Sequence, residues 1–108
     1  MEQITTQQLK EKISNKENFI LDLFATWCGP CKVMLNTLGR LEEVIASESS
    51  ETPKYKFYKY DIDSDREFVM EVLEIRSVPT VKIFNEGKET YSKVGIIPSD
   101  EIKRLLTK

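Results

Sequence analysis

The sequence contains no histidine and only two cysteines, Cys28 and Cys31. Without histidine, Ser-His and Cys-His nucleophilic catalysis is excluded, and a tetrahedral zinc site would need carboxylates in place of its usual ligands. Small secreted proteins carry several disulfides spread along the chain, whereas a bridge between these two positions closes a very small loop and adds little stability. The cysteine content therefore favours reversible sulfur chemistry over a structural cross-link.

Long apolar runs and an excess of one charge are also missing. The chain has 16 basic and 18 acidic residues and a net charge of -2, so it has no broad positive field to hold nucleic acid or an anionic membrane. Its first residues lack the features of a secretory signal, and its most apolar segment, residues 19–25, is short and interrupted by Asp22. We therefore expect a cytoplasmic protein with no membrane span, unless a leader has been removed.

The chain has the size and composition of one globular domain. It contains 108 residues, of which 40% are hydrophobic and 31% charged, a balance that supports one hydrophobic core. No internal repeat or low-complexity segment divides the sequence. We expect a single domain over residues 1–108.

The first half of the chain alternates between strand and helix patterns. Ile4 is expected in a short edge strand, and residues 5–8 have the spacing of a capping box that begins a helix. The nearly continuous apolar segment 19–25 predicts a strand covered on both faces of a sheet. A long helix is expected to begin at the cysteines, because an apolar stripe follows them at helical spacing. This stripe consists of Met34, Leu38, Leu41 and Ile45.

The second half continues this alternation. The predicted elements are a loop over 47–53, a strand over 54–62, a helix opened by a capping box at 64–67, a hairpin of strands 81–84 and 89–94 turning at Gly87, and a last helix capped by Ser99. The expected core residues of the two helices are Phe68, Val69, Val72 and Leu73, and then Ile102, Leu105 and Leu106. Together the elements predict an α/β fold in which a central mixed sheet carries helices on both faces.

The segment Cys28-Gly29-Pro30-Cys31 lies between the buried strand and the long helix. Only a thiolate attacks a disulfide, and the free N–H groups and dipole of a helix N-terminus lower the pKa of Cys28. Cys31 lies one turn further into the helix, which predicts that it is shielded and resolves the mixed disulfide formed by Cys28. Pro30 suits the first helical turn, where its missing N–H costs nothing. There are two alternatives to a redox-active pair: the cysteines are half of a zinc site, or they are two buried thiols that lie close together by coincidence.

Asp22 is the second candidate for chemistry. A carboxylate within an apolar strand is expected to have a raised pKa through desolvation, which lets it assist deprotonation of Cys31 near neutral pH. The alternative is an edge-strand aspartate that faces water. Lys59, on the following strand, is either a neighbour that moderates the charge of Asp22 or an ordinary exposed lysine.

Pro79 directly precedes a predicted strand, where it cannot donate to a ladder. A cis peptide bond is one explanation, although the pattern alone favours trans. Four apolar residues have two possible interpretations, because each is either part of the core or part of an exposed rim that grips a substrate. They are Trp27, Val78, Ile96 and Ile97.

Taken together, these motifs resemble those of the thioredoxin family over essentially the whole chain. The features that carry the resemblance are Asp22 six residues before Cys28, the Ala-Thr-Trp-Cys-Gly-Pro-Cys-Lys segment at 25–32, Asp61-Ile62-Asp63, Val78-Pro79-Thr80, the turn at Gly87 and Val94-Gly95. A lone Cys-x-x-Cys motif is weak, but this combination is specific.

The resemblance implies a general protein-disulfide reductase that carries no cofactor and acts as a monomer. Its substrates would be protein disulfides, and a flavin-containing thioredoxin reductase would recharge it from NADPH. The implied roles are attack by Cys28, resolution by Cys31, proton acceptance by Asp22 beside Lys59, and a cis-proline at Pro79 that presents the Val78 backbone to an extended substrate. The implied contact rim consists of Trp27, Ile62, Val78, Gly95 and Ile96.

Three positions depart from the family pattern: Asn36 replaces a common helix-kinking proline, Phe24 a frequent tryptophan and Ser77 a frequent glycine. The likeness of the Gly-Pro pair between the cysteines to that of thioredoxins implies a reducing redox potential, rather than that of an isomerase or oxidase, because these residues tune the relative stability of the thiolates. The alternative to a reductase, from a different functional class, is a binding module that uses the same surface without transferring electrons.

Overall fold

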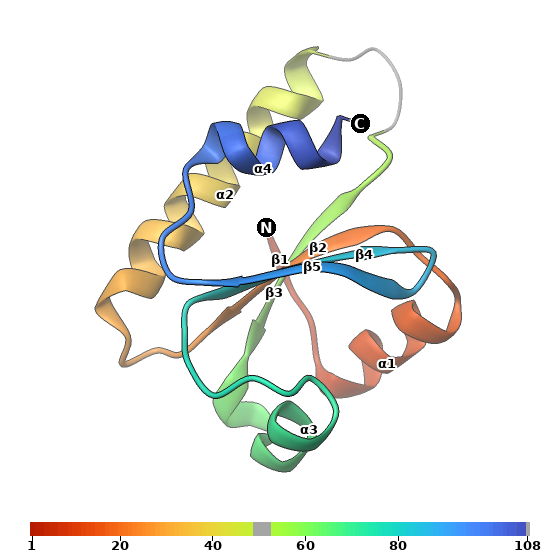
Figure 1. The fold of residues 1–108 in the computed structure, drawn as a ribbon, viewed down its shortest axis with the longest axis vertical. Coiled ribbons are helices and arrows are strands. Elements are labelled where there is room, and N and C mark those ends of the chain that lie inside the picture. The colour runs from red at the N-terminus through yellow and green to blue at the C-terminus, as the bar shows by residue number, and fades with distance from the viewer. Residues whose placement is uncertain (49–52, 108) are drawn as a thin grey trace.

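The computed structural model describes residues 1–48 and 53–107. Their elements are β1 (Glu2–Gln3), α1 (Thr6–Ser14), β2 (Phe19–Phe24), α2 (Gly29–Glu48), β3 (Lys56–Asp61), the 3₁₀ helix η1 (Ile62–Ser64), α3 (Arg66–Glu71), β4 (Thr80–Asn85), β5 (Lys88–Val94) and α4 (Ser99–Leu106). The strands form one mixed sheet in the order β1-β3-β2-β4-β5. Helices α2 and α4 cover one face and α1 and α3 the other (Figure 1), which confirms the predicted architecture. No helix in the described ranges has the length and apolar character needed to cross a bilayer.

The central strand β2 is buried along its whole length. It pairs in parallel with β3 and antiparallel with β4, so it has no free edge. Because side chains alternate along a strand, Leu21 and Leu23 pack in the core on the side of α3, while Ile20 packs against α2. Asp22 therefore points toward α2 from the middle of the sheet, and the edge-strand alternative for this residue is wrong.

Helix α2 runs without interruption through Asn36 from Gly29 to Glu48. The predicted apolar stripe is confirmed, with three of its residues buried and Ile45 partly buried against the same core. The predicted start of the loop at residue 47 is too early, because α2 continues to Glu48. Ser47 lies in the last turn of this helix, where its hydroxyl donates to the Val44 carbonyl at 2.9 Å. Residues 49–52 of that loop lie outside the described residues.

Two predicted helix starts are wrong by one residue. The cap of α3 is Asp65, whose Oδ1 accepts the Phe68 N–H at 3.0 Å, while the Ser64 hydroxyl donates to the Asp61 carbonyl at 2.6 Å and closes η1. Pro98 precedes α4 in an extended conformation, which leaves Ser99 inside the helix without a capping bond. The capping box at α1, in contrast, is confirmed by both reciprocal hydrogen bonds between Thr5 and Gln8.

One predicted core residue of α3 is exposed. Phe68, Val69 and Leu73 are buried, but 60% of Val72 is accessible to solvent. The regular helix ends at Glu71, so the helical period no longer places Val72 on the core face. The chain instead turns Leu73 and Ile75 inward.

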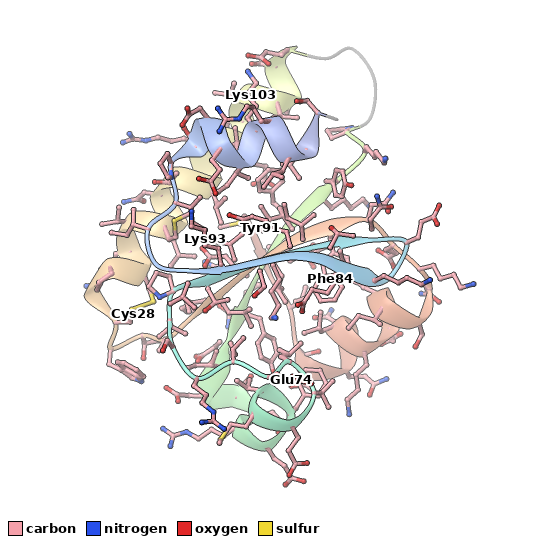
Figure 2. All side chains as sticks on the ribbon, viewed as in Figure 1. Cys28, Glu74, Phe84, Tyr91, Lys93 and Lys103 are labelled. Atoms are coloured by element: carbon pink, nitrogen blue, oxygen red, sulfur yellow. A yellow bond between two sulfur atoms is a disulfide. The ribbon has the colours of Figure 1, made fainter. Side chains whose placement is uncertain are left out.

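The hairpin of β4 and β5 confirms the predicted turn at Gly87, where φ is +79°. The residues of β5 also hold α4 in place, because Tyr91 and Lys93 point toward that helix (Figure 2). The Tyr91 hydroxyl donates to Glu101 at 2.8 Å, and Lys93 forms an ion pair with the same carboxylate at 3.2 Å. Ile102 and Leu106 complete the core below α4, with Leu105 partly buried beside them, as predicted.

Candidate active site at the Cys28–Cys31 disulfide

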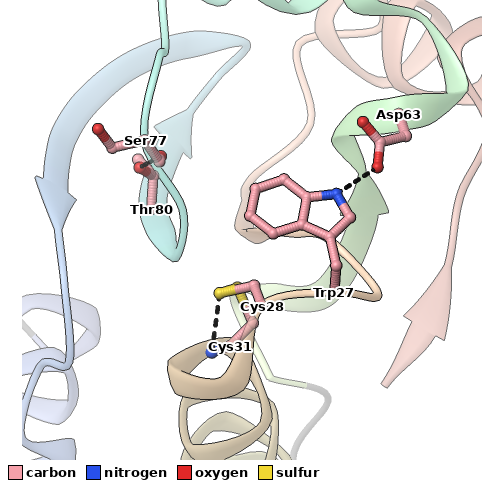
Figure 3. The surroundings of a disulfide bond; sticks show 6 residues. All are labelled: Trp27, Cys28, Cys31, Asp63, Ser77 and Thr80. Atoms are coloured by element: carbon pink, nitrogen blue, oxygen red, sulfur yellow. Dashed lines mark hydrogen bonds between the residues drawn. A yellow bond between two sulfur atoms is a disulfide. The ribbon is translucent and has the colours of Figure 1, made fainter.

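Cys28 and Cys31 form a disulfide at the junction between β2 and α2. The Cys28 N–H donates to the Ala25 carbonyl at 3.2 Å, which closes the loop that leads into the helix. Cys28 then occupies the cap position of α2, and its Sγ accepts the N–H of Cys31 at 3.2 Å (Figure 3). A thiolate at this position is stabilised by the free N–H groups and the positive end of the helix dipole.

The two cysteines are not equally accessible. The exposed fraction is 6% for Cys28 and 1% for Cys31. Both pack in a small apolar cluster with Phe24 and Ala25, and this cluster excludes water from the deeper sulfur. Gly29 and Pro30 are exposed on the first turn of α2, where the missing N–H of proline removes no helical hydrogen bond.

Asp22 lies on the same face of β2 as Phe24, next to the cysteine cluster. Its side chain has no solvent exposure, and neither carboxylate oxygen has a hydrogen-bond partner. Burial raises the pKa of Asp22 to about 7, and the charge of Lys59 opposes part of that rise. The two residues are direct partners in the β2–β3 register, so the structure brings them together as the sequence analysis suggested.

The Val78–Pro79 peptide bond is cis, in agreement with the resemblance rather than with the bare pattern. The loop that contains this peptide bond is held at both ends by hydrogen bonds. The Thr80 hydroxyl donates to the Ser77 carbonyl at 2.6 Å, and the Gly95 N–H donates to the Pro79 carbonyl at 2.8 Å. This loop stands across from Cys28 in Figure 3, and the partly buried Val78 packs against the cysteine cluster.

Known proteins resemble this chain in sequence and in structure. The Thioredoxin family model matches residues 1–108. Thioredoxin of Mycoplasmoides gallisepticum is 37% identical over 107 residues, which cover 98% of this chain and 99% of the relative. Thioredoxin-1 of Saccharomyces cerevisiae is 32% identical over 95 residues, or 88% and 84% of the two chains. The crystal structure of chloroplastic thioredoxin z superposes with a TM-score of 0.80 at 29% identity, covering 99% of this chain and 91% of the other.

The chain belongs to the thioredoxin family. With its paired cysteines, it is a thiol-disulfide oxidoreductase with a redox-active disulfide. Within residues 1–48 and 53–107, no group of three or more cysteine, aspartate or glutamate side chains is arranged to hold a metal ion.

Two residues of the expected rim of this thioredoxin are exposed, and the other three, Ile62, Val78 and Gly95, are partly buried. The exposed fraction is 68% for Trp27 and 55% for Ile96, whereas Ile97 is buried and belongs to the core. Ile62 and Val78 are partly buried beside the cysteine cluster. The structure thereby decides which of the four ambiguous apolar residues line the surface around the disulfide.

A groove of about 760 Å³ begins at Trp27 and extends toward α3. Its lining includes Ile62, Val69, Met70 and Val78. Sequence reasoning missed Met70, which is 59% exposed, because a methionine next to predicted core residues is more often part of the core.

Sequence reasoning also assigned no contact to Asp63, although it is part of the family motif. Its Oδ2 accepts the Trp27 indole N–H at 2.8 Å (Figure 3), and its Oδ1 accepts two hydrogen bonds from Arg66. Trp27 and Asp63 are far apart in the sequence, so no local pattern signals their contact.

Proposed function

We propose that this thioredoxin is a protein-disulfide reductase in which Cys28 attacks and Cys31 resolves. In the reduced protein, the Cys28 thiolate attacks one sulfur of a target disulfide, forms a mixed disulfide and releases the other target sulfur as a thiolate. Cys31 then attacks the Cys28 sulfur, which frees the second target thiol and closes the Cys28–Cys31 bond. The target gains two electrons and the protein loses two.

The observation that carries this assignment is the asymmetry of the two sulfurs at the start of α2. Cys28 accepts the N–H of Cys31 at the cap position, while Cys31 has the smaller exposed fraction. Charge stabilisation therefore favours Cys28 as the thiolate, and burial keeps Cys31 from attacking a target directly. Cys31 attacks the Cys28 sulfur once the mixed disulfide has made that sulfur electrophilic. Gly29 and Pro30 keep the span between the two cysteines short.

Asp22 accepts the proton of Cys31 in this proposal. An acceptor must be ionised for part of the time near the working pH, and a pKa of about 7 satisfies that condition. Lys59 is its electrostatic neighbour on β3 and keeps the pKa from rising further. The unpartnered carboxylate oxygens leave Asp22 free to receive a proton.

The substrate surface is the rim around the disulfide. The cis-Pro79 loop presents the Val78 backbone for strand-like pairing with an extended target segment, and Gly95 supports that loop through its bond to Pro79. Trp27, Ile62 and Ile96 supply apolar contacts on the two sides. This surface suits a protein segment that contains a disulfide.

We also propose that residues 1–108 act as one cytoplasmic, monomeric domain without its own cofactor. Its electrons would come from an NADPH-dependent flavoprotein, thioredoxin reductase, which docks on the same rim. Reduction of the isolated protein by NADPH should therefore require such a reductase.

Insulin reduction with dithiothreitol tests the proposal. The parent protein is expected to accelerate precipitation of the reduced insulin chains, and Cys28→Ser should lose the acceleration. Cys31→Ser should accumulate a covalent adduct through Cys28, detectable by mass spectrometry and released by excess thiol. A protein that binds insulin without accelerating its reduction would instead be a binding module, and an adduct through neither sulfur would overturn the assigned roles.

The redox potential of the Cys28–Cys31 couple separates a reductase from an oxidase. It is measured by equilibration with glutathione buffers while the fluorescence of Trp27, the only tryptophan, reports the disulfide. A reducing potential, below that of the glutathione pool, supports the proposal. A potential typical of periplasmic oxidants would contradict it.

A further inference from the structure

Trp27 is held in place by a hydrogen bond more than by packing. Its side chain is 68% exposed, so neighbouring atoms restrict its ring only weakly. Its Nε1 donates to Asp63 Oδ2 at 2.8 Å, and the ring lies beside the disulfide in Figure 3. The orientation of the indole therefore depends on the orientation of the Asp63 carboxylate.

Arg66 determines that orientation. Its Nε and Nη2 donate to the same oxygen, Asp63 Oδ1, at 3.2 and 3.1 Å, which leaves Oδ2 for the indole of Trp27. The backbone of Asp63 is itself fixed, because its N–H donates to Asp61 Oδ1 at 2.9 Å. Two donors from one guanidinium restrict the carboxylate more than a single ion contact would.

The three side chains come from different elements that meet at one groove. Trp27 lies in the loop before α2, Asp63 in η1, and Arg66 is the first residue of α3. All three line the groove that begins at Trp27. The position of the indole ring therefore determines the shape of this end of the groove.

We propose that Arg66 is a positioning residue, which acts through Asp63 to hold Trp27 as the wall of the groove that receives a protein substrate. This inference rests on the proposed reductase function. A protein segment extends from its disulfide into the groove and contacts the wall, whereas a small disulfide reaches Cys28 with far fewer contacts. Arg66 thus contributes to the preference for protein disulfides by preorganising the surface.

The first test compares Arg66→Met with the parent for two substrates, insulin and the small disulfide 5,5′-dithiobis(2-nitrobenzoate). The KM for insulin should rise about threefold with kcat retained, because an exposed ion pair contributes only modestly. The rate with the small disulfide should change much less. Arg66→Lys should restore part of the affinity, and 1 M salt should bring the parent toward the variant.

A second readout follows Trp27 itself, without reference to turnover. Because Trp27 is the only tryptophan, its fluorescence anisotropy reports the mobility of this one ring. Arg66→Met should lower the anisotropy, and Asp63→Ala, which removes the acceptor of the indole N–H, should lower it at least as much. Arg104→Met is the matched control, because it breaks a remote, exposed pair with Asp100 on α4 and should change neither anisotropy nor KM.

The double variant distinguishes positioning from direct contact with the substrate. If Arg66 acts through Asp63, adding Arg66→Met to Asp63→Ala should have no further effect on the KM for insulin. A full threefold effect in that background would overturn the proposal in favour of direct contact, as would unchanged anisotropy in Arg66→Met. Failure of the parent to reduce insulin would instead contradict the proposed function, and the anisotropy measurement would still test the Arg66–Asp63–Trp27 arrangement.

Discussion

At the scale of single residues, Asp22 is the group whose environment departs most from that of an ordinary side chain. It is a fully buried carboxylate without a hydrogen-bond partner, and burial raises its pKa to about 7. Burial without hydrogen bonds favours the protonated form, while the positive charge of Lys59 favours the ionised form. The balance of these two effects sets the pH at which Asp22 accepts a proton.

Asp22→Asn should therefore reduce the rate of disulfide exchange in a pH-dependent way. Above pH 7 the parent has an ionised acceptor and the variant does not, so the variant should be slower by at least about tenfold. Below about pH 6 Asp22 is already protonated in the parent, and the two rates should converge. Stopped-flow measurement of insulin reduction across this range checks the prediction, and a constant rate ratio would show that Asp22 is not the acceptor.

Lys59→Met provides an independent check on the same group. Removing the positive charge removes the effect that lowers the pKa of Asp22, so the inflection in the pH–rate profile should move upward. The rate at high pH should remain near that of the parent. An inflection that stays in place would mean that Lys59 does not act on Asp22.

At the scale of secondary structure elements, two glycines, Gly87 and Gly39, have opposite effects on stability. Gly87 turns the β4–β5 hairpin with a positive φ, and a Cβ there would lie 2.5 Å from the backbone oxygen of Ile13 at the end of α1. Gly39 lies within α2, where an added Cβ meets nothing within 4 Å. Glycine is thus required in the turn but only weakens the helix.

Gly87→Ala and Gly39→Ala should therefore shift the free energy of unfolding in opposite directions. Gly87→Ala should destabilise the protein by roughly 2 kcal/mol or more through backbone strain and the clash with Ile13. Gly39→Ala should stabilise it by about 0.5–1 kcal/mol, because alanine has the higher helix propensity. Urea denaturation of the oxidised proteins checks both, and equal effects in the two variants would contradict the explanation.

The strands β4 and β5 are also joined by a buried lysine. Lys82 has an exposed fraction of 3%, and its Nζ contacts Glu89 Oε1 at 2.6 Å and Ser92 Oγ at 3.2 Å. An ammonium in this position depends on its partners, because few water molecules can reach it.

Glu89→Ala should destabilise the protein by about 2 kcal/mol, because it leaves the buried ammonium of Lys82 without its carboxylate. Replacing both partners, with Lys82→Met and Glu89→Ala, should recover most of that loss because no charge then remains buried. Asp100→Ala is the control, since its exposed pair with Arg104 should contribute less than about 0.5 kcal/mol. A double variant as unstable as Glu89→Ala would disprove this account.

At the scale of the whole molecule, Asp22 also makes the folding stability depend on pH. Its pKa is about 7 in the folded protein against an ordinary value of 3.8, so the folded state binds the proton more tightly than the unfolded chain does. A raised pKa contributes stability that is fully present below the unfolded value and is lost as the pH rises through the folded value. Since one pKa unit corresponds to about 1.4 kcal/mol, the loss is on the order of 4 kcal/mol.

The parent should therefore lose stability between about pH 4 and pH 7 through this group, and Asp22→Asn should lose much less. Chemical denaturation at a series of pH values, with the disulfide kept oxidised, measures both curves. The difference between the two proteins should widen as the pH rises and level off above neutrality. Parallel curves would mean that the pKa of Asp22 is not raised in the folded protein.

Much of the architecture was predictable because it depends on local patterns. The capping box at Thr5, the stripe along α2 and the turn at Gly87 each require only neighbouring residues, and each is confirmed. The errors at Ser64 and Ser99 come from helix ends, where several nearby residues compete for the same cap position. Val72 was placed in the core because the helix was expected to extend further than it does.

The kind of chemistry follows from the sequence alone, because the two cysteines, their spacing and their place before a helix are all local features. How the surrounding residues serve that chemistry depends on tertiary contacts. The central place of β2 in the strand order buries Asp22, and the meeting of η1 and α3 with the active-site loop brings Arg66 and Asp63 to Trp27. The Asp63–Arg66 pair joins residues only three apart, but the contact between Trp27 and Asp63 joins residues 36 apart. That contact and the burial of Asp22 depend on how distant segments pack, and the pKa of Asp22 depends on burial and distance, which no spacing in the sequence encodes.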